Sequence, residues 1–281
     1  MNRGLDKFKR IFTASLIYIE LIAVAIIVLY PLLWVIGSSI NPLNGINRGT
    51  MIPENPTFAN YIRLFEKTKF TSWYLNTLYV AVLTTIFSMV LHTITAYSFA
   101  RFKFRGRKAG LLLVMVLQMF PSFLGLTALY MVALNFHMLN NLNMLVIIYV
   151  AGGIPGNIWL VRGYMLNIPR SLDEAAYLDG ASKTQVFLKI ILPLSMPIVF
   201  FIAVTAFMGP WMDYMLPRYL ININEKRTLA IGLFDLVTRS DSDFTAFCAG
   251  SVLVAVPITI MYMIFQRFLL EGLTAGANKG E

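Results

Sequence analysis

The stretch PRSLDEAAYLDGASKTQVFLK, residues 169–189, is polar and lies between two long apolar runs. It is too polar to cross a bilayer. Ser171, with Glu174 three residues later, has the spacing of a capping box and predicts the start of a helix just after Pro169. Asp179-Gly180 has the composition of a tight turn and ends that helix.

A second short helix is expected from Ala181 to about residue 188. In the first helix, Leu172, Ala175 and Ala176 share a face at helical spacing. Small alanines permit close approach of another chain, and Gly180 lets the backbone turn sharply. The stretch therefore predicts helix, turn, helix, a shape suited to docking with a partner protein.

The rest of the chain is strongly apolar. Of its 281 residues, 58% are hydrophobic and 13% charged, against about 25% charged in a typical soluble domain. Runs that approach or exceed the roughly 20 residues needed to span a bilayer recur along it. Six are predicted to be membrane helices: 14–40, 73–100, 110–134, 141–165, 190–218 and 245–269. Prolines inside these runs suggest kinks, at Pro121, Pro155, Pro210 and Pro257.

The net charge of +9 does not indicate nucleic-acid binding, because the basic residues flank the apolar runs. They are concentrated in the N-terminal tail, in the connection 101–109 and in the segment 169–189. Positive charges mark the cytoplasmic side of a membrane protein. The sequence therefore predicts a multi-pass plasma-membrane protein with both termini in the cytoplasm, and with 41–72 and 219–244 outside.

With these motifs in view, the chain resembles a known family. The segment around 169–189 is similar to the EAA motif of ABC-importer permeases, in the matches Glu174-Ala175-Ala176, Asp179-Gly180-Ala181, Phe187, Leu192-Pro193 and Pro197. The similarity to the smaller maltose/maltodextrin permease subunit extends to Phe99–Gly106, Gln118–Pro121 and the tail Gly272–Gly280, in which Ala277-Asn278 is the variable part.

This resemblance implies an all-α integral membrane protein with six transmembrane helices and the type I ABC-importer permease fold. A single permease domain would cover 1–281, with a coupling segment at 169–189 and a cytoplasmic tail at 270–281. The implied partners are a larger permease subunit, two ATP-binding-cassette subunits and an external sugar-binding protein. The implied substrate is a maltodextrin-type oligosaccharide.

The family also implies roles for particular residues. Contact with the ATPase is expected from Glu174, Ala175, Ala176, Asp179, Gly180 and Ala181. The tail would reach the interface between the ATPase subunits, through Gly272, Thr274 and Gly276. A simpler alternative for the tail is a frayed terminus.

Three polar residues in or near the spans are candidates for the sugar path: Gln118, Asn157 and Asp213. Gln118 and Asn157 equally fit hydrogen bonds between neighbouring helices. Asp213 equally fits an interfacial ion pair with Arg218.

No cofactor is expected to bind this chain. The glycine-rich run Gly152–Gly156 lacks the Gly-Lys-Ser/Thr of a phosphate loop, so ATP must be bound and hydrolysed by the partner subunits. Close helix packing explains that run better. His92 and His137 have no metal-ligand spacing.

Other classes of protein fit less well. A secondary transporter would couple to an ion through buried charges or through broken helices in an inverted repeat. This sequence has few intramembrane charges and no visible repeat. An intramembrane enzyme would need a motif such as HExxH or GxSxG, and neither occurs. A permease of the same family for another oligosaccharide or solute stays open, because the coupling motif recognises the ATPase and not the substrate.

Overall fold

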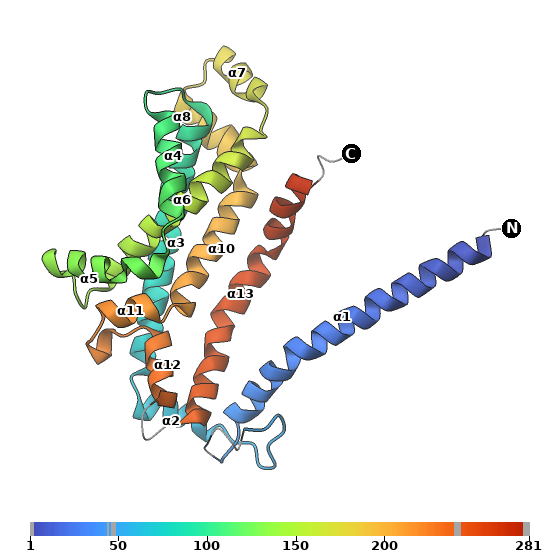
Figure 1. Cartoon of the computed structure of the whole chain (residues 1–281), viewed down its shortest axis with the longest axis vertical. Coiled ribbons are helices and arrows are strands. Elements are labelled where there is room, and N and C mark those ends of the chain that lie inside the picture. Colours follow the sequence, from blue (N-terminus) through green and yellow to red (C-terminus); the bar gives the residue numbers. More distant parts are fainter. Residues whose placement is uncertain (1–2, 44, 46–48, 239–242, 278–281) are drawn as a thin grey trace. The chain divides into compact units, whose positions relative to one another are not determined.

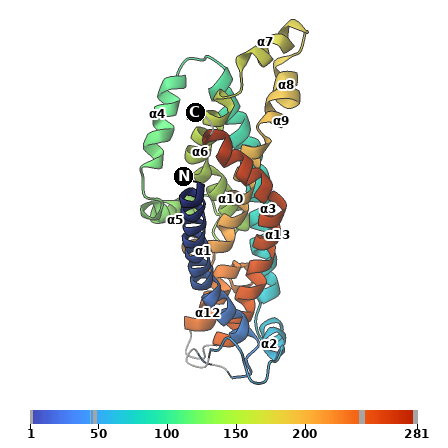
Figure 2. The same ribbon diagram turned by 90° about the vertical axis from the view of Figure 1, so that its right-hand side faces the viewer.

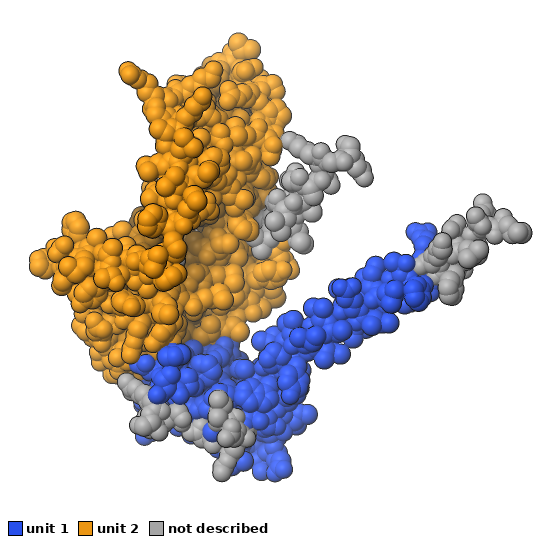
Figure 3. Space-filling model, viewed as in Figure 1, with its two compact units in different colours: residues 1–68, 233–253 blue, residues 69–232, 254–281 orange. Residues whose placement is uncertain are grey.

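The structure is a computed structural model that describes residues 3–43, 45, 49–238 and 243–277. For residues 3–9, 122 and 267–277 it describes the backbone alone. These residues form helices, turns and loops, with no strand in the described ranges. Two compact units are distinguished, one of residues 1–68 and 233–253, the other of residues 69–232 and 254–281 (Figure 3). Two of the three boundaries fall inside helices, and the single-domain organisation stays a prediction.

The first unit is built around a buried polar network. Its elements are α1 (Arg3–Ser39), α2 (Ala59–Lys67) and parts of α12 (Leu229–Thr238) and α13 (Phe244–Ala277). The buried Asn60 amide donates to the carbonyls of Ser39 and Asn41 at 2.9 and 2.8 Å. Arg63 forms an ion pair with Asp243, 2.6 Å from Nε to Oδ2. These bonds join the 41–72 connection to the end of the 219–244 connection.

Beyond Arg10, helix α1 carries one charged residue, Glu20, and the side chains of its apolar stretch are exposed within this chain. A helix that is hydrophobic all round belongs in a membrane or in a protein core. Its composition therefore suits contact with lipid or with another subunit.

Three long helices form the centre of the second unit: α3 (Phe70–Arg101), α6 (Leu142–Leu166) and α10 (Met196–Met212). They run side by side in both views (Figures 1 and 2). Fully buried apolar side chains fill the space between them, among them Val161, Met165 and Ile202. Long uncharged sequences make these helices, and their inward apolar residues hold them together.

Two predicted spans are bent rather than straight. The third consists of α4 (Arg107–Gln118), the short η2 (Ser122–Gly125) and α5 (Leu126–Asn135), with an 89° bend. Pro121 lies at that break. The fifth consists of α8 (Lys183–Val186), η3 (Phe187–Ile191), α9 (Leu192–Leu194) and α10, with a 74° bend between α9 and α10. Pro193 and Pro197 flank it.

The described residues therefore contain four unbroken helices long and apolar enough to cross a membrane, and up to six spans if each bent pair counts as one. The predicted ranges agree with this arrangement except at the fifth, 190–218, which starts and ends later than the helix pair Lys183–Leu194 and Met196–Met212. The prolines inside α6, α10 and α13 do not break those helices, so only one of the four predicted kink sites coincides with a break between helices.

The two ends of α3 contact different connections. At its start, the Trp73 indole donates to the Asn224 carbonyl at 3.0 Å, close to α11 (Met215–Leu220) and η4 (Asn224–Lys226). At its end, Arg101 contacts α7 (Arg170–Leu178). The connection 219–232 and the segment 169–189 therefore lie at opposite ends of α3, as the six-span topology requires.

Candidate functional site

The segment 169–189 forms two short helices joined at Gly180, at one end of the α3, α6 and α10 bundle (Figure 1). Gly180 has φ +80°, a conformation that residues with a Cβ rarely adopt. Its N–H donates to the Tyr177 carbonyl, and the Ala181 N–H donates to that of Ala176 at 2.9 Å. This pair of bonds is a Schellman motif, which ends α7 sharply. The predicted helix, turn and helix are confirmed.

The predicted capping box at Ser171 is wrong. Helix α7 begins at Arg170 and has no side-chain cap, so Ser171 and Glu174 lie inside it. The capping box belongs to α8 instead, where the Ser182 N–H donates to Gln185 Oε1 at 2.7 Å and the Gln185 N–H donates to Ser182 Oγ at 3.3 Å. The second helix starts two residues later than predicted and continues past Leu188 to Leu194, where the 74° bend separates it from α10.

Burial divides the coupling residues into two groups. Of the six residues predicted to contact the ATPase, four are exposed: Glu174, Ala175, Asp179 and Gly180. Ala176 is buried and Ala181 is partly buried. The predicted apolar face is only partly right, because Leu172 is exposed and Asp173 takes an inward position beside Ala176. Leu178 is 90% exposed, and the sequence interpretation did not single it out. The signal that could have identified it is a large apolar side chain within an otherwise polar segment, which is typical of a contact surface.

A buried ion pair ties α7 to the bundle. Arg101 Nε lies 2.9 Å from Asp173 Oδ2, and the two side chains are 4% and 10% exposed. The same guanidinium donates to the Ile168 carbonyl at 3.0 Å. Burial raises the pKa of the Asp173 carboxyl, and the Arg101 guanidinium opposes that rise. Helix α7 is thus attached to the end of α3 by a buried ion pair. Removing either partner alone would leave an unpaired buried charge, which is strongly destabilising.

Apolar packing joins the same segment to the bundle. Ala176 and Val186 belong to a core cluster that also contains Tyr97 of α3 and Met165 of α6. The Tyr97 and Phe187 rings lie 4.6 Å apart between centroids. The segment 169–189 and the ends of α3 and α6 therefore share one packed core.

A cavity of about 250 Å³ lies between α3, α6 and α10. Its lining is rich in hydroxyl and amide groups, from Thr84, Ser88, Tyr149, Asn157 and Thr205. Asn157 also bonds to His92 Nδ1 at 2.9 Å, and the other ring nitrogen of His92 bonds to the Val150 carbonyl. Within the described ranges, no group of His, Cys, Asp or Glu side chains could hold a metal ion.

The structure separates the three candidates for the sugar path. Asn157 lines the cavity. Asp213 does not, but it accepts a hydrogen bond from the lining Tyr149 hydroxyl at 2.9 Å. Gln118 is exposed near Gly156 and lies outside the lining. Tyr149 is the residue that sequence reasoning missed, because one tyrosine in an apolar helix carries no distinguishing pattern.

The glycine-rich run of α6 packs closely at one position. A Cβ on Gly153 would lie 2.9 Å from His92 Cε1, whereas a Cβ on Gly152 would meet nothing within 4 Å. The expectation of close helix packing is therefore confirmed at Gly153, where α6 meets α3.

The backbone of the predicted tail is helical rather than irregular as far as Ala277. Helix α13 continues to Ala277, so Gly272, Thr274 and Gly276 extend the helix. Their side chains, and residues 278–281, lie outside the described part of the chain.

Comparison with known proteins defines the class. Residues 92–273 match the family described as binding-protein-dependent transport system inner membrane component. The chain is 40% identical to the galactooligosaccharides transport system permease protein GanQ of Bacillus subtilis, over 98% of both chains. It is 39% identical to the maltodextrin transport system permease protein MalD of Streptococcus pneumoniae, over the whole of both.

Among solved structures, a chain of a bacterial ABC transporter involved in the import of the polysaccharide alginate superimposes with a TM-score of 0.79. The match covers 96% of this chain and 99% of that one at 24% identity, and it shows a shared fold. The protein therefore belongs to the family of binding-protein-dependent transport system inner membrane components. It is a multi-pass membrane permease with the type I importer fold, and not an enzyme.

Proposed function

We propose that this chain is one of two membrane-spanning subunits of an ATP-driven importer that carries oligosaccharides into the cell. The observation that carries the proposal is the full-length similarity to permeases of the maltodextrin and galactooligosaccharide systems. The assembly would contain a larger permease subunit, two ATPase subunits that bind and hydrolyse ATP, and an external sugar-binding protein.

The exposed residues of α7 and its turn dock into the ATPase. Glu174 and Asp179 offer charge, Ala175 and Gly180 allow close approach, and Leu178 offers an apolar anchor. The inward residues Ala176 and Ala181 instead pack on the core of this chain. ATPase closure then moves α7, and the Asp173 contact with Arg101 carries the movement to α3.

The side chains that line the cavity between α3, α6 and α10 form one wall of the sugar path. Its volume of about 250 Å³ is below the roughly 300 Å³ at which ligand pockets begin, so this chain alone does not enclose an oligosaccharide. The larger permease subunit supplies the opposite wall. Hydroxyl and amide groups suit sugar hydroxyls, and Asn157 and Tyr149 are the residues most directly placed to bind them.

The proposal includes an orientation and a role for the tail. The N-terminal tail, the connection 101–109 and the segment 169–189 face the cytoplasm, because they carry the basic residues. With six spans the C-terminus lies on the same side. The connections 41–72 and 219–244 face outward and receive the binding protein. The end of α13, with Gly272, Thr274 and Gly276, forms a second contact with the ATPase subunits.

Uptake measurements test the substrate class. Cells that contain the complete importer are compared with cells lacking this chain, with labelled maltotriose as the transported sugar. The proposal predicts uptake that depends on this chain and is competed by unlabelled maltodextrin. Galactooligosaccharides are the second candidate, because GanQ is as similar as MalD. Competition by galactooligosaccharides alone would assign that class, and uptake of neither sugar would overturn the oligosaccharide proposal.

A further inference from the structure

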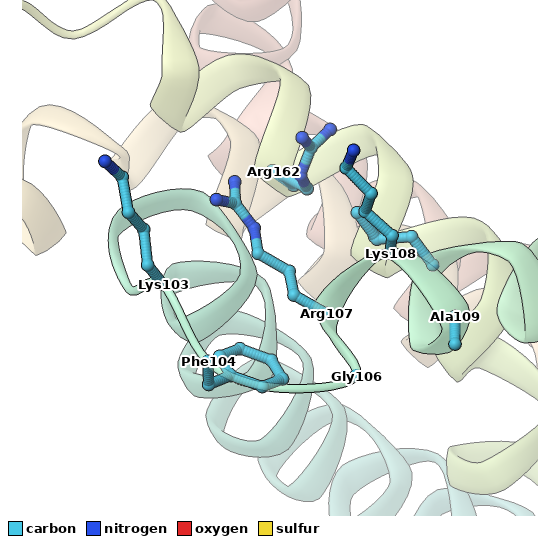
Figure 4. Close-up of a pocket in the computed structure, with 8 residues that line it drawn as sticks. Lys103, Phe104, Gly106, Arg107, Lys108, Ala109 and Arg162 are labelled. Carbon is cyan, nitrogen blue, oxygen red and sulfur yellow. The ribbon is translucent and has the colours of Figure 1, made fainter.

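A basic pocket of about 720 Å³ lies where the connection from α3 to α4 meets α6 (Figure 4). Four of its eight lining residues are cationic and none is acidic: Lys103, Arg107, Lys108 and Arg162. Figure 4 shows Arg107, Lys108 and Arg162 directed toward the same side of the pocket. Arg107 is close enough to Arg162 for their like charges to repel. Such a cluster is costly unless an anion neutralises it.

No such anion comes from this chain's described residues. No carboxylate among them forms an ion pair with any of the four cations. Arg162 is nevertheless held in place, since its Nε donates to the Phe99 carbonyl at 3.3 Å and its guanidinium lies 5.5 Å from the centroid of the Trp159 ring. Both contacts position the charge and leave it unneutralised.

The backbone adds further donors at the same place. Helix α4 is 12 residues long and starts at Arg107 after Gly106, and no side chain caps it. Lys108 and Ala109 of its first turn line the pocket. The free N–H groups and the positive end of the helix dipole favour a bound anion there.

An apolar surface continues from the pocket. Leu111 lines it, and along α4 the side chains of Leu112, Leu113 and Val116 are 60%, 59% and 52% exposed. An anionic group that filled the pocket would therefore have exposed hydrocarbon beside it. The neighbouring α3 and α6 are membrane spans, so the pocket lies at a membrane boundary.

We propose that this pocket binds the phosphate headgroup of an anionic phospholipid, with the acyl chains against the apolar face of α4. Basic pockets between membrane helices are suited to such headgroups. A free phosphate would use the cations and helix terminus but not the apolar face. The inference concerns a lipid site and does not depend on which solute the protein transports.

Lipid titration of the full-length chain tests the proposal. The purified chain in detergent is titrated with palmitoyl-oleoyl phosphatidylglycerol or phosphatidylcholine, and bound lipid is counted by native mass spectrometry. We expect phosphatidylglycerol to bind more tightly. Arg107→Gln and Lys108→Gln should each weaken its binding about fivefold, the equivalent of about 1 kcal/mol per charge. Arg107→Lys should retain it.

Arg105→Gln is the matched control, because Arg105 is exposed on the same connection but does not line the pocket. Its phosphatidylglycerol affinity should equal that of the unchanged chain. An equal loss of phosphatidylglycerol affinity in Arg105→Gln and Arg107→Gln would mean that the lipid is attracted by diffuse positive charge. That result would overturn the proposed site. Equal binding of the two lipids would also overturn it. Displacement of phosphatidylglycerol by inorganic phosphate at equal concentration would overturn the lipid assignment in favour of a soluble anion.

Discussion

At the scale of single residues, the Arg101–Asp173 pair decides whether α7 stays attached to the bundle. Arg101→Met leaves a buried carboxylate without its partner and should lower the free energy of unfolding by about 3–5 kcal/mol. The double variant Arg101→Met/Asp173→Leu removes both charges and should recover most of that loss. Unfolding in mixed micelles containing dodecyl sulfate measures both. Arg105→Met, on the exposed connection, should change stability by less than about 0.5 kcal/mol.

The loss in Arg101→Met should depend on pH. Burial already raises the pKa of the Asp173 carboxyl, and removing Arg101 takes away the cation that opposes the rise. A folded-state pKa above the unfolded one means that protonation favours the folded state. The variant should therefore be closer to normal stability at acidic pH and lose stability as the pH rises through the folded-state pKa. A deficit that does not change with pH would argue against an unpaired carboxylate.

Two neighbouring glycines of α6 test the close contact between α3 and α6. A Cβ at position 153 would overlap His92, so Gly153→Ala should destabilise the protein by about 1–3 kcal/mol. At position 152 there is open space, so Gly152→Ala should be neutral or stabilise by up to about 1 kcal/mol through helix propensity. The same unfolding assay compares them. Similar effects at both positions would contradict the close contact between α3 and α6.

At the scale of elements, the turn between α7 and α8 requires a left-handed residue. Proline fixes φ near −65° and removes the N–H that Gly180 donates to Tyr177, so Gly180→Pro should disrupt the Schellman motif. Asparagine tolerates the conformation and should spare it. We expect normal membrane insertion of both variants, with ATP hydrolysis stimulated by the binding protein lost in Gly180→Pro and largely kept in Gly180→Asn. Loss in both, or in neither, would show that the turn conformation is not what matters.

The sequence predicted these elements unevenly, for physical reasons. Apolar runs determine membrane spans almost alone, so all six ranges were predictable. The breaks were not, because Pro121 and Pro155 look alike in sequence although only Pro121 lies at a bend. Two serines carry the capping-box spacing, and only the structure shows that Ser182 caps a helix while Ser171 does not. Partners far apart in the chain, such as Arg101 and Asp173, leave no local pattern.

At the scale of the whole molecule, the two ends of α3 define two sides of the membrane. Cysteines introduced at Ile52 and Asn224 should react with an impermeant thiol reagent added outside intact cells, whereas one at Lys108 should react only after lysis. All three positions are exposed, and the native Cys248 is fully buried and should stay silent. Asn47, in the same connection as Ile52, lies outside the described residues. Labelling at position 108 in intact cells would show that the proposed orientation is wrong.

The central claim is that the exposed surface of α7 transmits ATPase closure to the membrane helices. It is tested most directly by sugar uptake into proteoliposomes that contain the complete importer, with ATP supplied to the ATPase subunits. Leu178→Asp places a charge on the most exposed apolar side chain of α7, and Ile52→Asp makes the same change at an 85% exposed residue of the 41–72 connection. We expect Leu178→Asp to lose both copurification of the ATPase and sugar uptake, and Ile52→Asp to keep its ATPase. Normal uptake and copurification in Leu178→Asp would contradict it.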